Sequence, residues 1–213
     1  MDLALLVADN NIREAVLGIL GRAESIGIGK VKCEAVVHPN RDPGCYHTGH
    51  ELLISYVKAC AHALVLFDRA WEGAPSPDPR VLAADVEEKL KPAWGNRARC
   101  IVIDPEVEVW IWSDSPHVAT ALGWTGRSPD LHSWLSQRGL WHPGQAKPSD
   151  PKRALNAALR EVRLPASSAI FAQVARTASL QRCTDTSFNT LLQILRSWFE
   201  VPNQGRSRRA RSV

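Results

Sequence analysis

Short apolar runs recur through the first half of the chain, separated by segments of helical length. Runs of this kind, rich in Val, Ile and Leu, are typical of strands in a parallel sheet that is buried on both faces. Four runs fit, and three of them end on an aspartate: Leu3 to Ala8 before Asp9, Val31 to Val37, Ala63 to Phe67 before Asp68, and Ile101 to Ile103 before Asp104. The pattern predicts an α/β fold with a mostly parallel, Rossmann-like sheet flanked by helices.

The segments between and after these runs place apolar residues at helical spacing. Asn10 or Asn11 is expected to cap a helix that ends near Gly21. Further helices are expected over residues 49–61, 81–90, 115–122, 131–137, 152–162, 167–178 and 185–199. Pro92 is expected to end the second of these. The C-terminal half is therefore predicted to be largely helical, with its helices packed around the sheet.

One segment gives two readings. Val107, Val109 and Ile111 alternate with other residues, as in a strand, whereas Pro105 suits the first turn of a helix. The alternation tips the prediction slightly toward a strand.

The end of the chain differs from the rest in charge. The formal net charge is +4, and Arg206, Arg208, Arg209 and Arg211 account for that excess. We expect residues 1–205 to form a single domain and residues 206–213 to be a disordered, Arg-rich tail that is either simply solvated or meets an acidic partner such as nucleic acid. Five cysteines without a paired motif, and no long apolar stretch, suggest a cytoplasmic protein without a membrane segment.

Acidic residues gather where the predicted strands end. Ligands and metals in open α/β sheets bind outside the carboxyl ends of the strands, and carboxylates are the ligands that Mg²⁺ prefers. The candidate metal ligands and catalytic residues are Asp9, Asp68, Glu106 and Glu108. The alternative is that each aspartate caps the next helix or begins a turn.

A polar segment follows the second predicted strand. His38, Arg41 and Asp42 are candidate contacts to a phosphate or a partner. The alternative is a turn that runs from His38 to Cys45 and is built by Asn40, Asp42 and Gly44. Eight tryptophans, Trp110, Trp112 and Trp124 among them, suit buried anchors in a core or at a protein interface.

Several of these segments, in this order, resemble a known bacterial family. They are Val36 to Cys45, Val65 to Arg69, Ile101 to Ser113, Ser115 to Val118, Leu122 to Trp124, Lys147 to Lys152 and Arg182 to Phe188. The likeness is to the fourth protein of the methylation-associated antiphage defence system and, more distantly, to a Toprim-like family of unknown function. It implies a helix after Pro105, against the alternation.

The resemblance implies a Toprim-like site in which an early Glu and an Asp-x-Asp pair hold Mg²⁺. Here Asp9 stands in place of the Glu, and Ala70 in place of the second Asp. The resemblance therefore predicts an accessory subunit of a multi-protein defence complex with a degenerate acidic site. Two alternatives stay open: an active Mg²⁺-dependent nuclease, and a protein-interaction scaffold. Other subunits of the system, nucleic acid and a second copy of the chain are the candidate partners.

Overall fold

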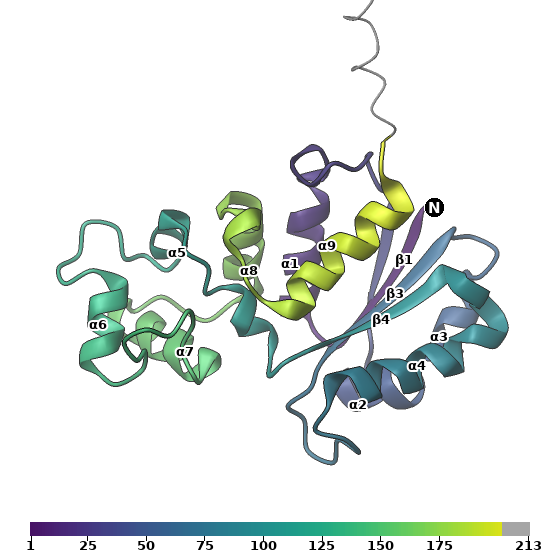
Figure 1. Ribbon diagram of the computed structural model, residues 1–213, viewed down its shortest axis with the longest axis horizontal. Coiled ribbons are helices and arrows are strands. Elements are labelled where there is room, and N and C mark those ends of the chain that lie inside the picture. The colour runs from purple at the N-terminus through teal and green to yellow at the C-terminus, as the bar shows by residue number, and fades with distance from the viewer. Residues whose placement is uncertain (202–213) are drawn as a thin grey trace, which may run out of the picture.

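The computed structural model describes residues 1–201, so the predicted tail at 206–213 lies outside the described residues. A four-stranded, all-parallel sheet with the order β2-β1-β3-β4 forms its centre (Figure 1). The strands are β1 (Leu3–Val7), β2 (Cys33–Val37), β3 (His62–Asp68) and β4 (Ala98–Ile103). Because all four run the same way, their carboxyl ends meet at one edge. The predicted α/β fold is confirmed.

Helices cover both faces of this sheet, which explains why β1 and β3 are apolar along almost their whole length. In Figure 1, helices α1 (Asn10–Leu20) and α9 (Thr186–Phe199) lie on one face. Helices α2 (Arg41–His47), α3 (Gly49–Leu53) and α4 (Pro79–Trp94) lie on the other.

The C-terminal half is helical, as predicted, but its helices do not all surround the sheet. Helix α8 (Ser168–Thr177) packs on α1, so closely that a Cβ added to Gly18 would lie 2.7 Å from that of Ala175. Helices α5 (Pro116–Ala121), α6 (Leu131–Gln137) and α7 (Pro151–Val162) lie beyond α8, away from the sheet (Figure 1). The expectation that they pack around the sheet is wrong.

Tryptophans give this outlying part its own packing. Trp112 and Trp124 are 1% and 3% exposed, and Trp112 Nε1 donates a hydrogen bond to the backbone oxygen of Pro151. Trp112 packs edge-on against Trp141, and Trp124 against Trp134. These rings are therefore core residues of the chain and are not free to anchor a partner.

Short helical segments connect the main elements. They are the 3-10 helices η1 (Ala23–Ile26), η2 (Ile54–Tyr56), η3 (Gly95–Arg97), η4 (Val107–Trp110) and η5 (Leu180–Arg182). The strand predicted over residues 107–111 is wrong, because this segment forms η4. All four residues of η4 are buried, so the alternation does not mark one face. The helix that the resemblance implied after Pro105 is confirmed.

Three other boundaries differ from the predictions. The turn ends at Asn40, since α2 begins at Arg41. The helix expected over 49–61 is divided into α3 and η2. Helix α4 continues past Pro92 to Trp94, which is 2% exposed, because burial of that ring outweighs the backbone hydrogen bond that proline cannot donate.

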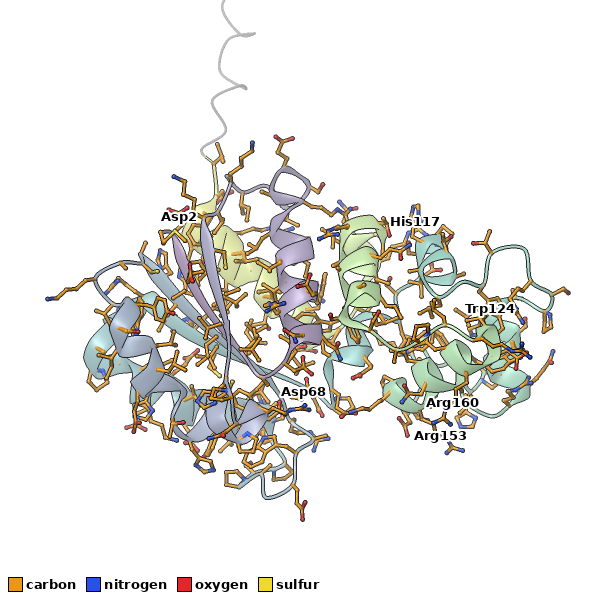
Figure 2. The ribbon with its side chains drawn as sticks, turned by 180° about the vertical axis from the view of Figure 1, so that it is seen from behind. Asp2, Asp68, His117, Trp124, Arg153 and Arg160 are labelled. Atoms are coloured by element: carbon orange, nitrogen blue, oxygen red, sulfur yellow. The ribbon has the colours of Figure 1, made fainter. Side chains whose placement is uncertain are left out.

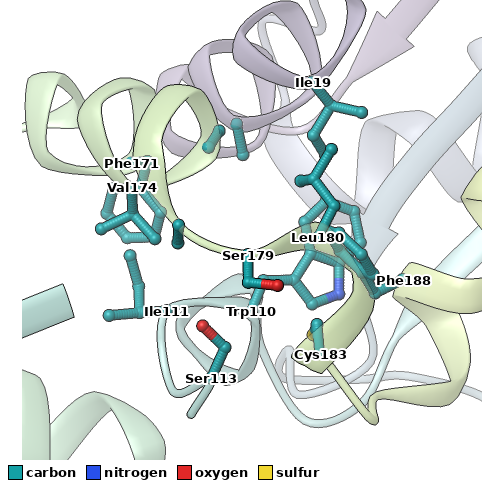
Figure 3. Close-up of a pocket in the computed structure, with 13 residues that line it drawn as sticks. Ile19, Trp110, Ile111, Ser113, Phe171, Val174, Ser179, Leu180, Cys183 and Phe188 are labelled. Carbon is teal, nitrogen blue, oxygen red and sulfur yellow. The ribbon is translucent and has the colours of Figure 1, made fainter. Parts of the chain in front are cut away.

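A small cavity lies where α1, α8, η4 and α9 meet (Figure 3). Its volume is about 30 Å³, and Ile19, Phe171 and Phe188 are among its apolar lining residues. This is roughly the volume of one water molecule, so the cavity is a packing gap and not a metabolite site. Within residues 1–201, no helix combines the length and the apolar character that crossing a membrane requires.

Candidate functional site

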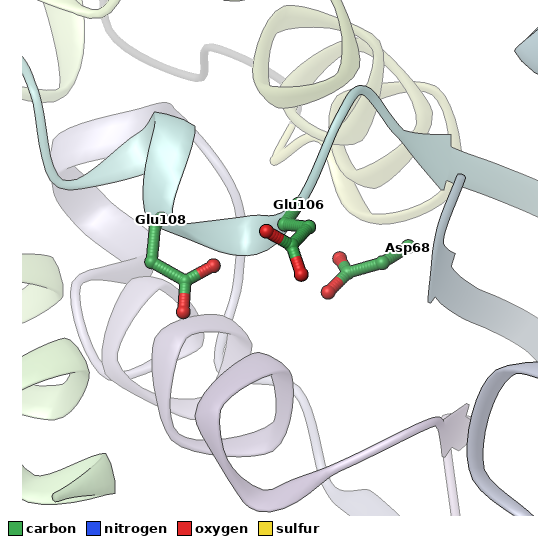
Figure 4. Close-up of side chains that lie close together, drawn as sticks. All are labelled: Asp68, Glu106 and Glu108. Atoms are coloured by element: carbon green, nitrogen blue, oxygen red, sulfur yellow. The ribbon is translucent and has the colours of Figure 1, made fainter. Parts of the chain in front are cut away.

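Three carboxylates converge outside the carboxyl ends of β3 and β4. One oxygen from each of Asp68, Glu106 and Glu108 lies within 4.8 Å of the other two, and Figure 4 shows the three groups facing a common space. We call these three residues the acidic triad. All three were predicted from the sequence as candidate metal ligands, together with Asp9, and the structure brings these three close together.

Two neighbouring elements position the triad. Asp68 is the last residue of β3, so it projects from the edge of the sheet. The chain leaves β4 at Ile103 and turns into η4, where Glu106 precedes the first residue and Glu108 follows one residue into the helix. Because β4 pairs with β3, with Asp68 beside Ile103, this turn brings both glutamates to Asp68.

The triad is held in an environment that disfavours negative charge. Asp68 is 9% exposed and Glu108 is 6% exposed. Burial, then the charges of Asp42 and Glu108, raise the pKa of Asp68 well above its ordinary value. Burial likewise raises the pKa of Glu108. Asp68 Oδ1 and Glu108 Oε2 are buried without a hydrogen-bond partner in the described part of the chain. These oxygens lack the positive partner that a buried carboxylate requires.

One cationic side chain already contacts the triad. Lys152, in the first turn of α7, donates a hydrogen bond from Nζ to Glu106 Oε1. The contact neutralises one carboxylate and leaves Asp68 and Glu108 without an ion pair among residues 1–201. Sequence reasoning did not single out Lys152, because it lies 46 residues from Glu106 along the chain.

Asp104 follows a strand in the same way as Asp68 but lies outside the triad. Its Oδ1 accepts a hydrogen bond from Nε of Arg69. The two aspartates therefore have different environments: Asp104 is exposed and paired with a cation, whereas Asp68 is buried among acids.

Asp9 and Asp42 lie next to the triad and have structural partners. Asp9 Oδ1 caps helix α1 by accepting from the backbone amide of Ile12 at 2.9 Å, as the capping alternative predicted. The expectation that Asn10 or Asn11 is the cap is wrong, because the helix begins at Asn10. Asp42 Oδ1 accepts from the backbone amide of Asp68 at 2.8 Å. Burial raises the pKa of Asp42, although that hydrogen bond works to lower it. A catalytic or metal-binding role for Asp9, and a phosphate contact by Asp42, stay predictions.

His38 and Arg41 shape the start of α2. His38 is 5% exposed; its Nδ1 accepts from the amide of Asn40, and its Nε2 lies 3.1 Å from Thr48 Oγ1. Both ring nitrogens are thus occupied within the protein, which does not favour a phosphate contact by His38. Arg41 is exposed and has a φ of +50°, in the left-handed region. Its phosphate contact stays a prediction.

The donor set of the triad fits a hard divalent cation. Mg²⁺ binds oxygen ligands at about 2.0–2.1 Å, so ligands around one ion lie roughly 3–4 Å apart. Small side-chain movements would bring the three oxygens into that range from their present separation of at most 4.8 Å. The unpartnered oxygens of Asp68 and Glu108 supply the observation that favours an ion.

Comparison of the chain with known protein families, with curated proteins and with solved structures finds no match.

Proposed function

We propose that the protein is an accessory subunit of a bacterial antiphage defence system, working in the cytoplasm with other subunits of that system, and that its acidic triad binds Mg²⁺. The single observation that carries the metal site is the pair of buried, unpartnered oxygens, Asp68 Oδ1 and Glu108 Oε2, within a cluster of three carboxylates. A bound cation would offset the burial and the neighbouring negative charges that together raise the pKa of Asp68.

The role in defence depends on the resemblance, and the geometry adds a chemical use for the ion. When bound beside carboxylates, Mg²⁺ retains open positions that take phosphate oxygens. Asp68 and Glu108 would hold the ion at the sheet edge, and Glu106 would share its charge between the ion and Lys152. The triad is thus suited to fixing a phosphate group against this edge of the sheet.

A thermal unfolding series with a matched pair of variants tests this proposal. Asp68→Asn removes one triad carboxylate, whereas Asp104→Asn changes the equivalent residue after the neighbouring strand, outside the triad. Wild type and Asp104→Asn should unfold at a higher temperature in Mg²⁺ or Mn²⁺ than in EDTA, because an ion that binds only the folded state stabilises it. Asp68→Asn should show no such rise. An equal rise in all three proteins, or none in wild type, would contradict a metal site at the triad.

Defence is tested separately, by phage plating on bacteria that carry the complete system. Asp68→Asn should lose protection, and Asp104→Asn should keep it. Full protection by Asp68→Asn would separate the triad from the defence role.

A second candidate function is Mg²⁺-dependent phosphodiester hydrolysis. Three converging carboxylates favour this reaction more than a lone aspartate would. Purified protein would be incubated with labelled DNA and RNA in Mg²⁺, alongside Asp68→Asn. Cleavage by wild type that is absent in Asp68→Asn and in EDTA would make the protein a nuclease. Absence of cleavage by a protein that shows the metal-dependent rise in unfolding temperature would assign the ion a binding role.

A further inference from the structure

A basic groove adjoins the acidic triad along helix α7. Its volume is about 590 Å³, and Glu106 of the triad lies at its border. The charged side chains that line it are four cations and two anions: Arg138, Lys152, Arg153 and Arg160 against Glu106 and Asp150. The groove is thus positive overall, and it shares Glu106 with the site that we propose for Mg²⁺.

Helix α7 presents its arginines on one face. Arg153 and Arg160 are seven residues apart, which is about two helical turns and roughly 10 Å along the axis. Both are exposed, whereas Ala154, Leu155, Ala158 and Leu159 of the same helix are buried against the protein. Figure 2 shows Arg153 and Arg160 close to one another on the outlying helical part, with Asp68 nearer the middle of the molecule.

The two arginines differ from the other cations of the groove in having no acidic partner. Lys152 pairs with Glu106, and Arg138 lies 3.8 Å from Glu161. Among residues 1–201, neither Arg153 nor Arg160 has a carboxylate oxygen within 4.0 Å of its side-chain nitrogens. Their guanidinium groups are free to bind an anion from solution.

We infer that this groove binds the phosphodiester backbone of a nucleic acid and leads it to the acidic triad. Arginine is well suited to bidentate contacts with phosphate. A phosphate is favoured over an acidic polypeptide because the groove includes Glu106 of the triad that would hold Mg²⁺, an ion that commonly binds the substrate's phosphate oxygens. The inference rests on the proposed function, since it names the class of ligand for the same site.

The lining also predicts how the nucleic acid is recognised. The residues that line the groove include no aromatic side chain on which a base would stack. Contacts limited to phosphates carry no sequence information and weaken steeply with salt. Binding should therefore be independent of sequence and strongly dependent on ionic strength.

Fluorescence anisotropy with labelled single-stranded and duplex oligonucleotides of two unrelated sequences tests the inference. The measurements are made in EDTA, so that they report on the groove without the metal. The double variant Arg153→Ala/Arg160→Ala is compared with Lys91→Ala/Arg176→Ala, which removes two exposed helical cations from α4 and α8. The comparison is repeated in the full chain with Arg206, Arg208, Arg209 and Arg211 replaced by Ser, which removes the charge of the C-terminal arginines.

The groove variant should bind about tenfold or more weakly at low salt, and its plot of log affinity against log salt should be shallower by about two. The Lys91/Arg176 variant should bind like wild type. Equal losses in both double variants, or binding that depends only on the C-terminal arginines, would overturn the inference. Equally tight binding of poly-glutamate would overturn it in favour of an acidic polypeptide.

Failure of the groove and failure of the metal site are distinguishable. If Asp68→Asn abolishes the metal-induced rise in unfolding temperature but the groove variant binds oligonucleotides normally, the groove inference fails and the metal site stands. If the groove variant loses binding and no protein responds to Mg²⁺, the groove inference stands and the metal site fails.

Discussion

Asp42 holds the end of strand β3 in place, because its Oδ1 accepts a hydrogen bond from the backbone amide of Asp68 at 2.8 Å. The bond joins the first turn of α2 to Asp68, which is the last residue of β3 and a member of the acidic triad. It also sets a second carboxylate beside Asp68, and the charge of Asp42 contributes to the raised pKa of Asp68. The same side chain therefore both positions Asp68 and disfavours its ionisation.

Two substitutions at Asp42 separate these effects. Asp42→Asn retains an acceptor oxygen, Asp42→Ala removes it, and both remove the charge. We expect Asp42→Ala to be less stable to urea than Asp42→Asn by about 1–3 kcal/mol, because the amide of Asp68 would lose its partner. The measurement is the free energy of unfolding at pH 7.5 in EDTA. Equal stability of the two variants would contradict a structural role for the hydrogen bond.

The raised pKa values predict how stability depends on pH. Burial is the main cause of the raised pKa of Asp68, Glu108 and Asp42, so the folded state binds protons more tightly there than the unfolded state does. Their contribution to stability is present below the ordinary carboxyl pKa of about 4 and is lost as the pH rises through the raised values. Without metal, these three carboxylates should therefore destabilise the protein at neutral pH.

Asp68→Asn tests this dependence. In EDTA at pH 7.5 the variant should unfold at a higher temperature than wild type, and the difference should shrink as the pH falls toward 4. Subtracting the plot of unfolding temperature against pH for wild type from that for the variant cancels the contributions of other ionisable groups. Asp78 and Asp130, whose pKa values are lowered, are examples. A constant difference over this range would contradict the raised pKa of Asp68.

The triad could be predicted because its geometry follows from the sheet. The apolar runs identified β3 and β4, and parallel pairing of adjacent strands brings their carboxyl ends together. The same signal did not separate Asp68 from Asp104, since both follow a strand directly. The two aspartates differ in their partners. Asp68 lies beside the glutamates that η4 positions, whereas Asp104 pairs with Arg69. Both arrangements depend on the three-dimensional fold.

Features that depend on distant packing could not be predicted. Lys152 reaches Glu106 only because α7 packs against η4, and no local pattern indicates that contact. Similarly, Val107, Glu108 and Val109 alternate as in a half-exposed strand, but the fold buries Glu108 beside Asp68. That burial depends on packing against distant elements and is not visible in the sequence.

Removal of Lys152 should leave more negative charge of the triad unpaired, so that Mg²⁺ stabilises the protein more. Burial works to lower the pKa of Lys152, but the hydrogen bond that its Nζ donates to Glu106 and the negative charges of the triad outweigh burial, and the pKa is raised. Lys152→Met should lower the unfolding temperature in EDTA at pH 7.5 and enlarge the rise caused by Mg²⁺. Arg153→Met, which changes the next residue of α7, should leave that rise as in wild type. The same Mg²⁺ response in both variants would show that Lys152 does not share the charge of the triad.

Gly44 is required by the ring of His38. A Cβ at position 44 would lie 2.0 Å from His38 Nδ1 and 2.9 Å from Asn40 Cβ. The ring has no room to withdraw, because it is buried and hydrogen-bonded at both nitrogens. Gly44→Ala should therefore lower the free energy of unfolding by about 1–3 kcal/mol, as other overpacked sites do.

A matched glycine and a double variant make this prediction specific. Gly21 has an ordinary φ of −62°, and its nearest contact for an added Cβ is 3.4 Å, so Gly21→Ala should be neutral or should stabilise by up to about 1 kcal/mol. His38→Ala should relieve the clash, so that adding Gly44→Ala to it costs less than adding the same change to wild type. Additive losses in urea unfolding would mean that the two residues do not compete for space. In that case the start of α2, and with it the position of Asp42, would not depend on the contact between Gly44 and His38.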